Sequence, residues 1–499
     1  MIQLFTIDPL DNVAVTFHDL KKDDLLTVND LTFPAQNAVD RGHKVAVSPI
    51  SKGQEIIKYG ASIGIATKEI AQGEPVHVQN MKTNLSGRVE YTYRPKKTKL
   101  MVESFTDLPS LQLFKRQNGT AGIRNELWVV PTVGCVNSVA ANIIAEFTKG
   151  RDLSGVDGVF SFPHPYGCSQ LGGDHERTRK MLQNIAMHPN AGGVLVLGLG
   201  CENNQVKTFR ETLPEQANIE RFAFLEAQEV EDEIAAGVEL LEQLYAKASR
   251  DVRTTGEWAD LVIGLECGGS DAFSGITANP LIGKASDYLI AHGGTAVLTE
   301  VPEMFGAEHI LMQQCNDQNV FEQTVAMVNE YKEYYESHNQ PIYENPSPGN
   351  KRGGITTLEE KSLGCTRKAG SSSVVDVVRI DERIDKQGLN LLYSPGNDIV
   401  ATTALGAAGC QLVLFSTGRG TPLGGFIPTI KIASTSALAQ KKANWIDFNS
   451  GVLTEQEASQ EDVLKQFLKK IILIVNGAMT SAEERNSREI AIFKTGVTL

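Results

Sequence analysis

The sequence predicts an α/β protein: a small N-terminal β-rich domain, a large and mostly parallel α/β core, and a C-terminal α/β domain. From residue 127 onward, short runs that are apolar on both faces alternate with helix-length segments. This alternation is typical of a parallel sheet covered by helices. The first 82 residues instead carry closely spaced short runs separated by glycines, which favours strands joined by tight turns.

Composition limits the classes of protein that this chain could be. Its 499 residues exceed the usual size of one domain. The net charge of −13 argues against nucleic acid or an anionic membrane surface as partner, and no stretch approaches the ~20 apolar residues that span a bilayer. The first residues show no secretory signal, and seven widely spread cysteines fit reduced thiols. We therefore expect a cytoplasmic protein with a small-molecule partner; a homo-oligomer is compatible with the sequence.

The elements divide the chain into four parts. Residues 1–82 form the β-rich domain, and residues 83–113 are poorly patterned and basic, which is typical of a linker. The central α/β domain is expected at 114–372, and it opens on a hairpin turn at Asn118-Gly119. The C-terminal α/β domain is expected at 373–499. Helical spacing of apolar residues predicts helices over 136–147, 177–188, 229–250 and 454–475.

Apolar runs in the core repeatedly end in a cysteine, a glycine or an acid. If the runs are neighbouring strands of one parallel sheet, their carboxyl ends border a single crevice, where open parallel sheets bind ligands. The side chains expected there are Cys135, Cys168, Cys201, Cys267 and Glu300. The four thiols could bind a borderline metal such as iron, with His164 as a further ligand. The alternative is that each cysteine packs as a small apolar side chain.

Two pairs of polar residues next to strands are candidates for binding an anionic small molecule. Arg124 and Asn125 directly precede the first strand of the core. Arg124 would either bind a carboxylate through two parallel N–H groups or attach the entry segment to the domain. Ser270 and Asp271 follow two glycines in a turn that suits an anion, or they cap the following helix.

Further cationic and polar residues lie in segments that predict loops. Lys351 belongs to a proline- and glycine-rich stretch at 345–354, and Arg419 and Thr421 belong to another at 417–422. Such loops are often functional in a compact chain, and their cations suit an anionic ligand. The glycine-rich stretch 192–200 fits neither a dinucleotide fingerprint nor a P-loop, which argues against NAD and ATP.

Several of these stretches together resemble the altronate/galactarate dehydratase family, and the resemblance covers nearly the whole chain. The segments that carry it are 122–127, 166–168, 198–202, 267–275, 345–351 and 416–422. The first 82 residues, through 42–44 and 58–60, are similar to the small SAF domain of that family. The resemblance therefore implies a SAF-like domain in front of the α/β core.

The resemblance implies a hydro-lyase that removes water from a sugar acid. Altronate would give 2-dehydro-3-deoxygluconate, in hexuronate catabolism, by loss of the proton next to the carboxylate and elimination of the neighbouring hydroxyl. The implied cofactor is Fe2+, with Mn2+ or an iron–sulfur cluster as alternatives. Galactarate or another sugar acid, a sulfo-lyase reaction on a related hydroxy acid, and a non-catalytic sugar-acid binding protein remain alternative functions.

The resemblance also suggests roles for titratable residues. His43 or His77 of the front domain would act as acid or base, because histidine titrates near working pH. Glu300 is a second candidate for the base. Gln79 stands where the family pattern has a second histidine, so a two-histidine role at 77–79 does not carry over directly.

Overall fold

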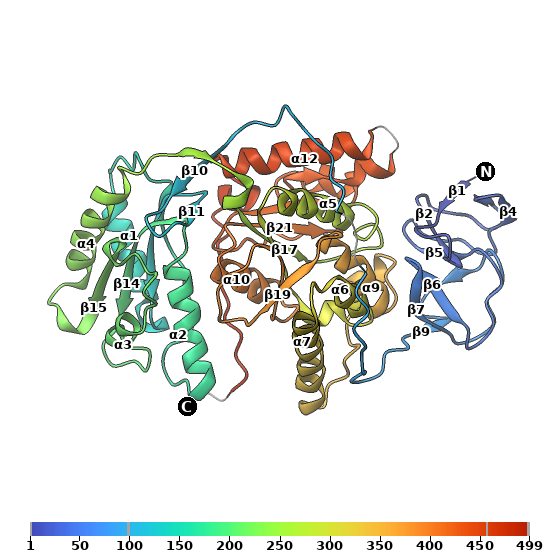
Figure 1. The fold of residues 1–499 in the computed structure, drawn as a ribbon, viewed down its shortest axis with the longest axis horizontal. Helices are drawn as coiled ribbons and strands as arrows, with labels where there is room; N and C mark the ends of the chain where they lie inside the picture. The colour runs from blue at the N-terminus through green and yellow to red at the C-terminus, as the bar shows by residue number, and fades with distance from the viewer. Residues whose placement is uncertain (1, 97–99, 456–457, 497–499) are drawn as a thin grey trace.

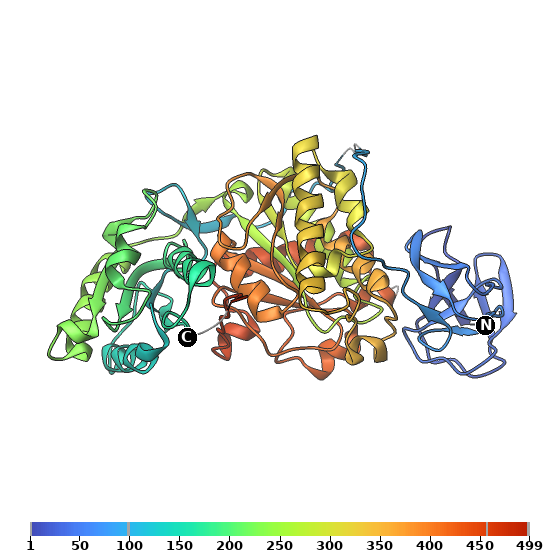
Figure 2. The same cartoon turned by 90° about the horizontal axis from the view of Figure 1, so that it is seen from below.

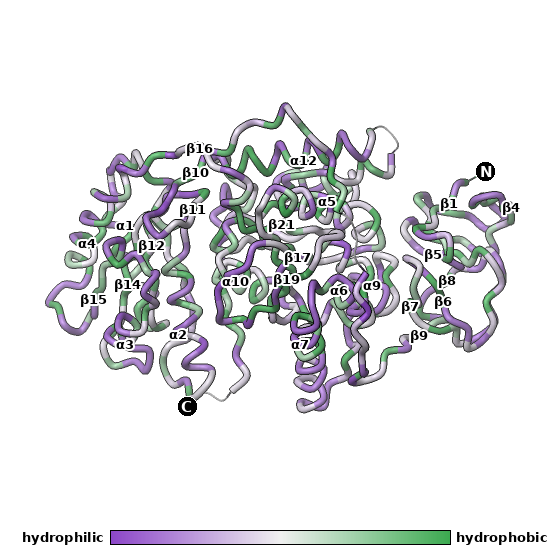
Figure 3. Tube along the Cα trace, viewed as in Figure 1, coloured by the Kyte–Doolittle hydropathy of each residue, from purple (hydrophilic) through white to green (hydrophobic). Residues whose placement is uncertain are grey.

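The computed structural model describes residues 2–96, 100–455 and 458–496, which fold into three domains (Figure 1). The C-terminal domain lies between the other two domains in both views (Figures 1 and 2). Apolar segments concentrate in the central strands, while the outer helices and connections are largely polar (Figure 3). This distribution is what burial of apolar surface produces. The predicted α/β fold class, with its β-rich front domain, is confirmed.

The N-terminal domain consists of a six-stranded sheet in the order β4-β3-β1-β2-β5-β8 and a three-stranded sheet in the order β6-β7-β9. Apart from the β1–β3 pair, the strands run antiparallel. The strands are β1 (Ile2–Phe5), β2 (Val13–Thr16), β3 (Leu25–Val28), β4 (Leu31–Pro34), β5 (Lys44–Ala46), β6 (Glu55–Lys58), β7 (Ala61–Ala66), β8 (Pro75–Val76) and β9 (Met81–Lys82). The last of these strands, β9, ends at Lys82.

The expected linker runs along the C-terminal domain. Its described residues between β9 and β10 (Leu111–Lys115) form no helix or strand. The Tyr91 hydroxyl donates to the buried carboxylate of Glu308, and the Tyr93 hydroxyl donates to the Cys315 carbonyl over 3.0 Å. These contacts attach the linker to the domain that it passes.

The second domain is a four-stranded parallel sheet in the order β13-β12-β14-β15, with helices on both faces. Helices α1 and α4 pack on one face, and α2 and α3 pack on the other. The elements are β12 (Glu126–Pro131), α1 (Asn137–Thr148), β13 (Gly158–Ser161), α2 (Gly172–Ala186), β14 (Ala191–Gly198), α3 (Val206–Glu211), β15 (Phe222–Glu226) and α4 (Glu233–Ala248). The predicted helices at 136–147, 177–188 and 229–250 are confirmed within a few residues.

The C-terminal domain is built on a seven-stranded, all-parallel sheet in the order β19-β20-β18-β17-β21-β22-β23. Its strands are β17 (Val262–Cys267), β18 (Thr295–Leu298), β19 (Val374–Val378), β20 (Gly388–Leu392), β21 (Leu412–Thr417), β22 (Thr429–Ala433) and β23 (Phe448–Asn449). Its helices are α5 (Ala278–Ala291), α6 (Glu308–Gln314), α7 (Gln318–Ser337), α8 (Pro348–Arg352), α9 (Leu358–Cys365), α10 (Asp398–Ala408), α11 (Ser436–Lys441), α12 (Gln460–Val475) and α13 (Ser481–Glu484).

The expected domain boundary between residues 372 and 373 is wrong, because it falls inside this sheet. Strand β18 comes before that boundary in the chain and pairs with β20, which comes after it; β17 and β21 are related in the same way. The core expected at 114–372 instead divides near residue 250, where the chain leaves α4 for the second sheet. Alternation of strands and helices predicts the class of fold, but it does not say which strands pair.

The second and C-terminal domains share an apolar core. Trp128 and Phe162 of the second domain pack in one cluster with Leu405 and Phe426 of the C-terminal domain, and α2 packs against α10. A three-stranded sheet in the order β11-β10-β16 connects the two domains, with β11 at Ala121–Gly122 and β16 at Thr254–Gly256. The predicted hairpin turn at 118–119 joins β10 to β11, and Gly119 has a φ of 84°. The position of one domain on the other is thus set by buried contacts.

Two smaller expectations have mixed outcomes. The segment 345–354 was expected to be entirely irregular, but Pro348–Arg352 forms one short helix because Ser347 and Asn350 cap it reciprocally. The apolar face of the predicted C-terminal helix, Leu464, Phe467, Leu468, Ile471 and Ile472, is buried in α12 as expected. Among the described residues, no helix combines the length and the apolar character needed to cross a bilayer.

Candidate active site

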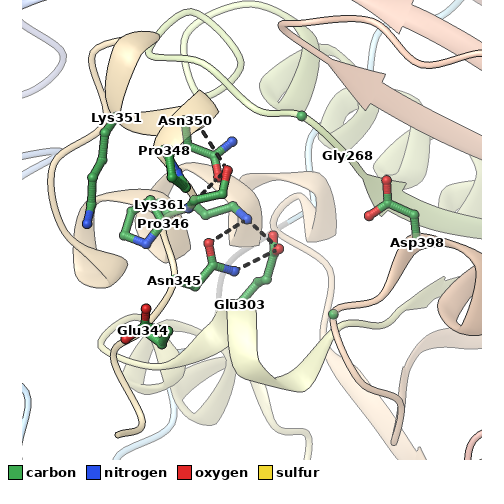
Figure 4. A pocket seen from close by; sticks show the side chains of 13 residues that line it. Gly268, Glu303, Glu344, Asn345, Pro346, Pro348, Asn350, Lys351, Lys361 and Asp398 are labelled. Carbon is green, nitrogen blue, oxygen red and sulfur yellow. Dashed lines mark hydrogen bonds and ion pairs between the residues drawn. The ribbon is translucent and has the colours of Figure 1, made fainter.

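A cavity of about 490 Å³ opens at the carboxyl edge of the seven-stranded sheet (Figure 4). Gly268 and Gly269 follow β17, Glu303 follows β18, and Asp398 begins α10 after β20. The chain turns to β18 on one side of β17 and later to β21 on the other side. A cavity at such a reversal of strand order is the usual ligand site of an open parallel sheet. The remaining lining residues are Glu344, Asn345, Pro346, Ser347, Pro348, Asn350, Lys351, Lys361 and Gly396.

A buried ion pair forms one wall of the cavity. The Lys361 ammonium donates to Glu303 Oε1 over 2.5 Å and to Asn345 Oδ1 over 3.2 Å, and Figure 4 shows the three side chains converging. Burial alone would lower the pKa of Lys361, but the neighbouring Glu303 raises that pKa above its ordinary value. Burial alone would raise the pKa of Glu303, but Lys361 and Lys368 hold it below the ordinary value. Both groups are therefore charged at neutral pH.

Asp398 lies across the cavity from this pair (Figure 4). Burial and the nearby Glu303 raise the pKa of Asp398 to about 6. A Cβ atom at Gly268 would lie 2.2 Å from Asp398 Oδ2, so a larger residue there would require the carboxyl to move. Asp398 is thus a carboxyl that changes protonation near working pH, as an acid–base catalyst requires.

A second layer of buried charge lies behind the cavity. The Lys368 ammonium is 2.8 Å from Cys267 Sγ and 3.3 Å from Glu300 Oε2, and Cys267 Sγ is 3.4 Å from Cys365 Sγ. Burial and the neighbouring Cys267 raise the pKa of Glu300 well above its ordinary value. Glu300 Oε1 has no hydrogen-bond partner among the described residues, and Glu300 adopts a left-handed backbone with φ 68°. The predicted base is therefore a buried residue behind the cavity, and it does not line the cavity.

This layer contains a set of three possible metal ligands, two of which already contact lysines. Ligand atoms of Cys267, Glu303 and Cys365 lie within 4.8 Å of one another, and thiolate with carboxylate suits a borderline ion. However, Lys368 contacts the Cys267 sulfur and Lys361 contacts the Glu303 carboxylate. A divalent ion would have to displace two buried ammonium groups, so these residues do not fit a resident Fe2+ or Mn2+.

His43 and His77 meet each other on the face of the N-terminal domain that docks onto the C-terminal domain. Their ring centroids are 5.0 Å apart, and His77 Nδ1 is 2.7 Å from Thr356 Oγ1. Burial and Lys44 lower the pKa of both rings, that of His77 to about 4. Neither ring lines the cavity. Both rings also hydrogen-bond with the backbone of the Lys351–Arg352 segment, whose other side borders the cavity.

A buried three-charge cluster holds the two domains together beneath these histidines. Lys44 and Lys58 of the N-terminal domain both contact the Glu360 carboxylate on α9, at 2.8 Å and 2.7 Å. Lys44 also donates to Thr356 Oγ1 and to the Gly354 carbonyl, each over 2.9 Å. All three charged side chains are at most 1% exposed. The N-terminal domain is therefore fixed beside the segment that borders the cavity.

The expected single crevice with all the thiols is wrong. Cys135, Cys168 and Cys201 follow strands of the four-stranded sheet, whereas Cys267 and Glu300 follow strands of the seven-stranded sheet. The first three thiols are exposed, and Cys267 is buried. The sequence placed each of them correctly at a strand end, but the strands belong to two sheets.

His164 is placed as a structural residue, contrary to its expected role as a ligand. Its Nε2 lies 2.8 Å from the Pro131 carbonyl, and its Nδ1 accepts from the Tyr166 amide over 3.2 Å. Both ring nitrogens are therefore engaged by the backbone, although the residue borders a cavity with Cys135 and Cys168. Burial lowers the pKa of this ring, which keeps it neutral.

Arg124 and Asn125 do not bind substrate in this fold. Arg124 is 2% exposed and contacts Glu483 through Nε at 2.8 Å and through Nη2 at 3.0 Å. Asn125 is fully buried and donates to the Gly155 and Ala248 carbonyls over 2.8 Å each. The alternative reading of Arg124, a tie within the entry segment, is the one that its contacts support.

Replacing Arg124 with Met is expected to lower the free energy of unfolding by up to about 3–5 kcal/mol, because the buried Glu483 would lose its two short contacts with Arg124 and be left with the 3.7 Å ion pair with Arg488. The KM of any substrate should not change. Arg88→Met is the matched control, since the Arg88–Glu333 pair is exposed on both sides and such pairs contribute about 0–1 kcal/mol. Urea unfolding of the variants measures both values; equal losses would contradict the structural role of Arg124.

The other residues predicted to bind substrate differ in whether they line the cavity. Lys351 lines it, and Ser270 directly follows the lining residue Gly269. Asp271 Oδ1 accepts from the Ser274 amide and hydroxyl over 2.9 Å each. These bonds close a turn, and the N-cap of the following helix α5 is Thr277, so the expected capping role of Asp271 is wrong. Arg419 is exposed and its amide donates to the Gly269 carbonyl, whereas Thr421 accepts from the Leu423 amide away from the lining.

Sequence reasoning missed the residues that carry most of the buried charge. These are Lys44, Lys58, Glu303, Glu360, Lys361, Cys365, Lys368 and Asp398. Helix α9 explains the omission: its sequence LEEKSLGC reads as a solvated helix, yet every residue in it is buried. A buried helix with this many charges requires partners from several segments, and the sequence alone does not identify them.

Fold and cavity define the class of protein as an α/β enzyme that acts on a small molecule. Three family descriptions match in succession: the altronate/galactarate dehydratase SAF domain at 2–84, the D-galactarate dehydratase/altronate hydrolase second domain at 113–249, and the D-galactarate/altronate dehydratase C-terminal domain at 258–498. The chain belongs to the altronate/galactarate dehydratase family.

Three curated relatives support this membership. The chain is 55% identical to altronate dehydratase of Escherichia coli (strain K12) and 49% identical to altronate dehydratase of Bacillus subtilis (strain 168), each over the full length of both proteins. It is 32% identical to galactarate dehydratase (L-threo-forming) of Escherichia coli (strain K12), over 88% of this chain and 86% of that protein. Identity is thus much higher to the two altronate dehydratases than to the galactarate dehydratase.

Proposed function

We propose that this protein is a hydro-lyase that converts D-altronate to 2-dehydro-3-deoxy-D-gluconate and water. The observation that carries the proposal is the cavity at the carboxyl edge of the seven-stranded sheet, which holds two lysines and an acid of raised pKa. Full-length identity of 55% and 49% to altronate dehydratases supports altronate over galactarate as the substrate. A sulfo-lyase reaction on a related hydroxy acid is the alternative with the same proton chemistry.

The lysines of the cavity suit a sugar acid. Lys351 and Lys361 both line the cavity, on α8 and α9 (Figure 4). Their ammonium groups would bind the substrate carboxylate and stabilise the negative charge that develops on it as the neighbouring C–H bond breaks. Asn345 and Asn350 offer amide groups to the hydroxyls.

Asp398 is the best placed acid–base group of the cavity. As the carboxylate it would remove the proton next to the substrate carboxylate, and as the acid it would protonate the hydroxyl that leaves. The enol product then tautomerises to the 2-oxo acid. The roles expected for His43, His77 and Glu300 remain predictions; the two histidines would act through the Lys351–Arg352 segment, which they contact.

The proposal includes three finer statements. The reaction belongs to hexuronate catabolism, it takes place in the cytoplasm, and it depends on Fe2+, Mn2+ or an iron–sulfur cluster. A homo-oligomer remains a prediction. A metal supplies a Lewis acid that stabilises an enediolate. Cys267, Glu303 and Cys365 do not fit such an ion, because Lys368 contacts the Cys267 sulfur and Lys361 contacts the Glu303 carboxylate, so no step above depends on one there.

The experiment is a 2-oxo-acid assay on purified protein, prepared without oxygen, with altronate, galactarate and a sulfonated hydroxy acid as separate substrates. The expected result is 2-dehydro-3-deoxygluconate from altronate, with at most slow turnover of the others. Release of sulfite from the sulfonated acid would favour the sulfo-lyase alternative. Failure to form any 2-oxo acid from altronate, with and without added iron, would contradict the proposal.

Asp398 gives the proposal a pH dependence. If its carboxylate is the base, kcat/KM should fall about tenfold per pH unit below about 6, because the protonated form cannot accept the proton. Asp398→Asn should remove this limb together with most of the turnover, by about 10²–10⁴-fold. Asp385→Asn on the surface is the control. An unchanged acid limb in the Asp398 variant would assign the base to another residue.

A further inference from the structure

Three exposed cysteines gather at one edge of the second domain, away from the cavity described above. Each follows a glycine: Gly134-Cys135, Gly167-Cys168 and Gly200-Cys201. The strands that precede them, β12, β13 and β14, are hydrogen-bonded neighbours that run parallel. Their carboxyl ends therefore lie at the same edge of the sheet. Of the seven cysteines, these three are exposed and the other four are buried.

Hydrogen bonds tie the three cysteine loops to one another. The Gly134 amide donates to the Tyr166 carbonyl over 2.9 Å, which joins the first loop to the second. The Asn204 amide donates to the Gly167 carbonyl over 3.0 Å, and its side chain donates to the Thr132 carbonyl over 3.0 Å. The third loop thus holds both of the others, so the three thiols are fixed by the fold.

The glycines before the cysteines allow this close approach. A Cβ atom at Gly167, whose φ is 99°, would lie 2.0 Å from the Thr132 carbonyl oxygen, and one at Gly134 would lie 2.7 Å from the His164 carbonyl oxygen. Backbone contacts this short exclude any larger residue. The repeated Gly-Cys pair therefore combines a tight packing of loops with an outward thiol on each loop.

A cavity lies beside two of the three thiols. Cys135 and Cys168 line a cavity of about 600 Å³. The neighbouring side chains are neutral amides and hydroxyls: Gln228 Nε2 lies 3.7 Å from Cys201 Sγ, and Ser169 Oγ lies 3.8 Å from Cys168 Sγ. At Cys267, by contrast, a lysine ammonium already contacts the sulfur. Among the described residues, the hydrogen bonds of the exposed thiols involve no such cation.

The geometry of the thiols argues against a single ion bound by all three. A single ion holds two thiolates within about 4.6 Å, because each metal–sulfur bond is about 2.3 Å. Among the described residues, the three exposed cysteines do not form a set of ligand atoms within 4.8 Å, whereas Cys267, Glu303 and Cys365 do. An iron–sulfur cluster places its thiolates farther apart because irons and sulfides lie between them.

We propose that Cys135, Cys168 and Cys201 bind an iron–sulfur cluster at the carboxyl edge of the four-stranded sheet. In a four-iron cluster, three thiolates would hold three of the irons, and the fourth would have no cysteine ligand. His164 takes no part, because both of its ring nitrogens bind backbone groups. The proposal does not depend on the substrate of the seven-stranded sheet's cavity.

The test measures metal and sulfide in the full chain, without using turnover. Protein is produced with iron and purified without oxygen, and iron, acid-labile sulfide and visible absorption are measured. The expected result is iron and sulfide in equal amounts with a broad visible band. The single variants Cys135→Ser, Cys168→Ser and Cys201→Ser should each lose at least about nine-tenths of both, while Cys315→Ala, a buried cysteine in the C-terminal domain, should retain them.

Circular dichroism and thermal unfolding establish that each exposed-site variant is folded. A wild-type protein without sulfide, or with iron that the three serine variants retain, would overturn the cluster. Iron without sulfide would also overturn it, even if the variants lose that iron. Because these readouts are independent of altronate, a cluster in a protein that does not turn over altronate would leave this inference intact and contradict only the proposed function.

Discussion

Replacing Lys361 with Met is expected to lower kcat/KM for altronate by about 10³-fold, the scale of losing one charge-stabilising donor in a dry site. Lys361 lines the cavity, is buried, and carries its charge at neutral pH because Glu303 raises its pKa. The same change leaves Glu303 buried without its partner, which should cost about 3–5 kcal/mol of folding free energy. Activity and stability therefore fall together in the single variant.

A double variant separates the two effects. Lys361→Met with Glu303→Gln removes both charges, and replacing both members of a buried pair is often close to neutral for stability. We expect stability to return while turnover remains lost, as measured by urea unfolding and by the 2-oxo-acid assay. Lys247→Met, an exposed lysine of α4 in the second domain, is the matched control. Recovery of turnover with stability would show that Lys361 acts only as a structural partner of Glu303.

The sequence predicts elements better than it predicts their partners. Apolar periodicity is a local property, so the face of α12 that carries Leu464 and Phe467 could be identified, as could the strand that ends at Cys267. The pairing of β17 with β21 joins residues far apart in the chain, and no local pattern encodes it. The thiols were therefore assigned to one crevice although they lie on two sheets.

Buried charge is the other feature that local patterns do not reveal. Glu360 and Lys361 are adjacent in the sequence, yet Glu360 contacts Lys44 and Lys58 of the N-terminal domain while Lys361 contacts Glu303. A charged residue is usually exposed, so a prediction from sequence places both on the surface. Only the folded chain shows that α9 separates two buried ionic clusters, one at the domain contact and one at the cavity.

Replacing Glu360 with Gln is expected to lower the free energy of unfolding by about 3–5 kcal/mol and to loosen the N-terminal domain. Two ammonium groups would remain buried around a neutral amide, with Lys44 Nζ and Lys58 Nζ each less than 3 Å from its position. Because Lys44 also donates to the Gly354 carbonyl, the Lys351–Arg352 segment beside the cavity should shift, and turnover should fall.

Urea unfolding measures the loss of stability, and proteolysis of the 83–110 segment measures the loosening of the N-terminal domain. A triple variant, Glu360→Gln with Lys44→Met and Lys58→Met, should recover stability; no recovery would contradict the electrostatic cause.

The same cluster gives folding stability a defined dependence on pH. Burial opposes the charge of Glu360, but the two lysines lower its pKa to about 2 from an ordinary 4.5. The contribution of Glu360 to folding stability is therefore present above about pH 4.5 and is lost as the pH falls toward about 2.

Lys44 gives stability a second pH dependence. Burial lowers the pKa of Lys44 to about 8 from an ordinary 10.5, because one carboxylate serves two ammonium groups. Between about pH 8 and 10.5, Lys44 binds more protons in the unfolded chain than in the folded chain. Lys44 therefore makes folding stability rise with pH from about 8 to 10.5. Lys44→Met should abolish that rise in unfolding titrations while Lys247→Met retains it, and an unchanged rise in the Lys44 variant would assign it to another group.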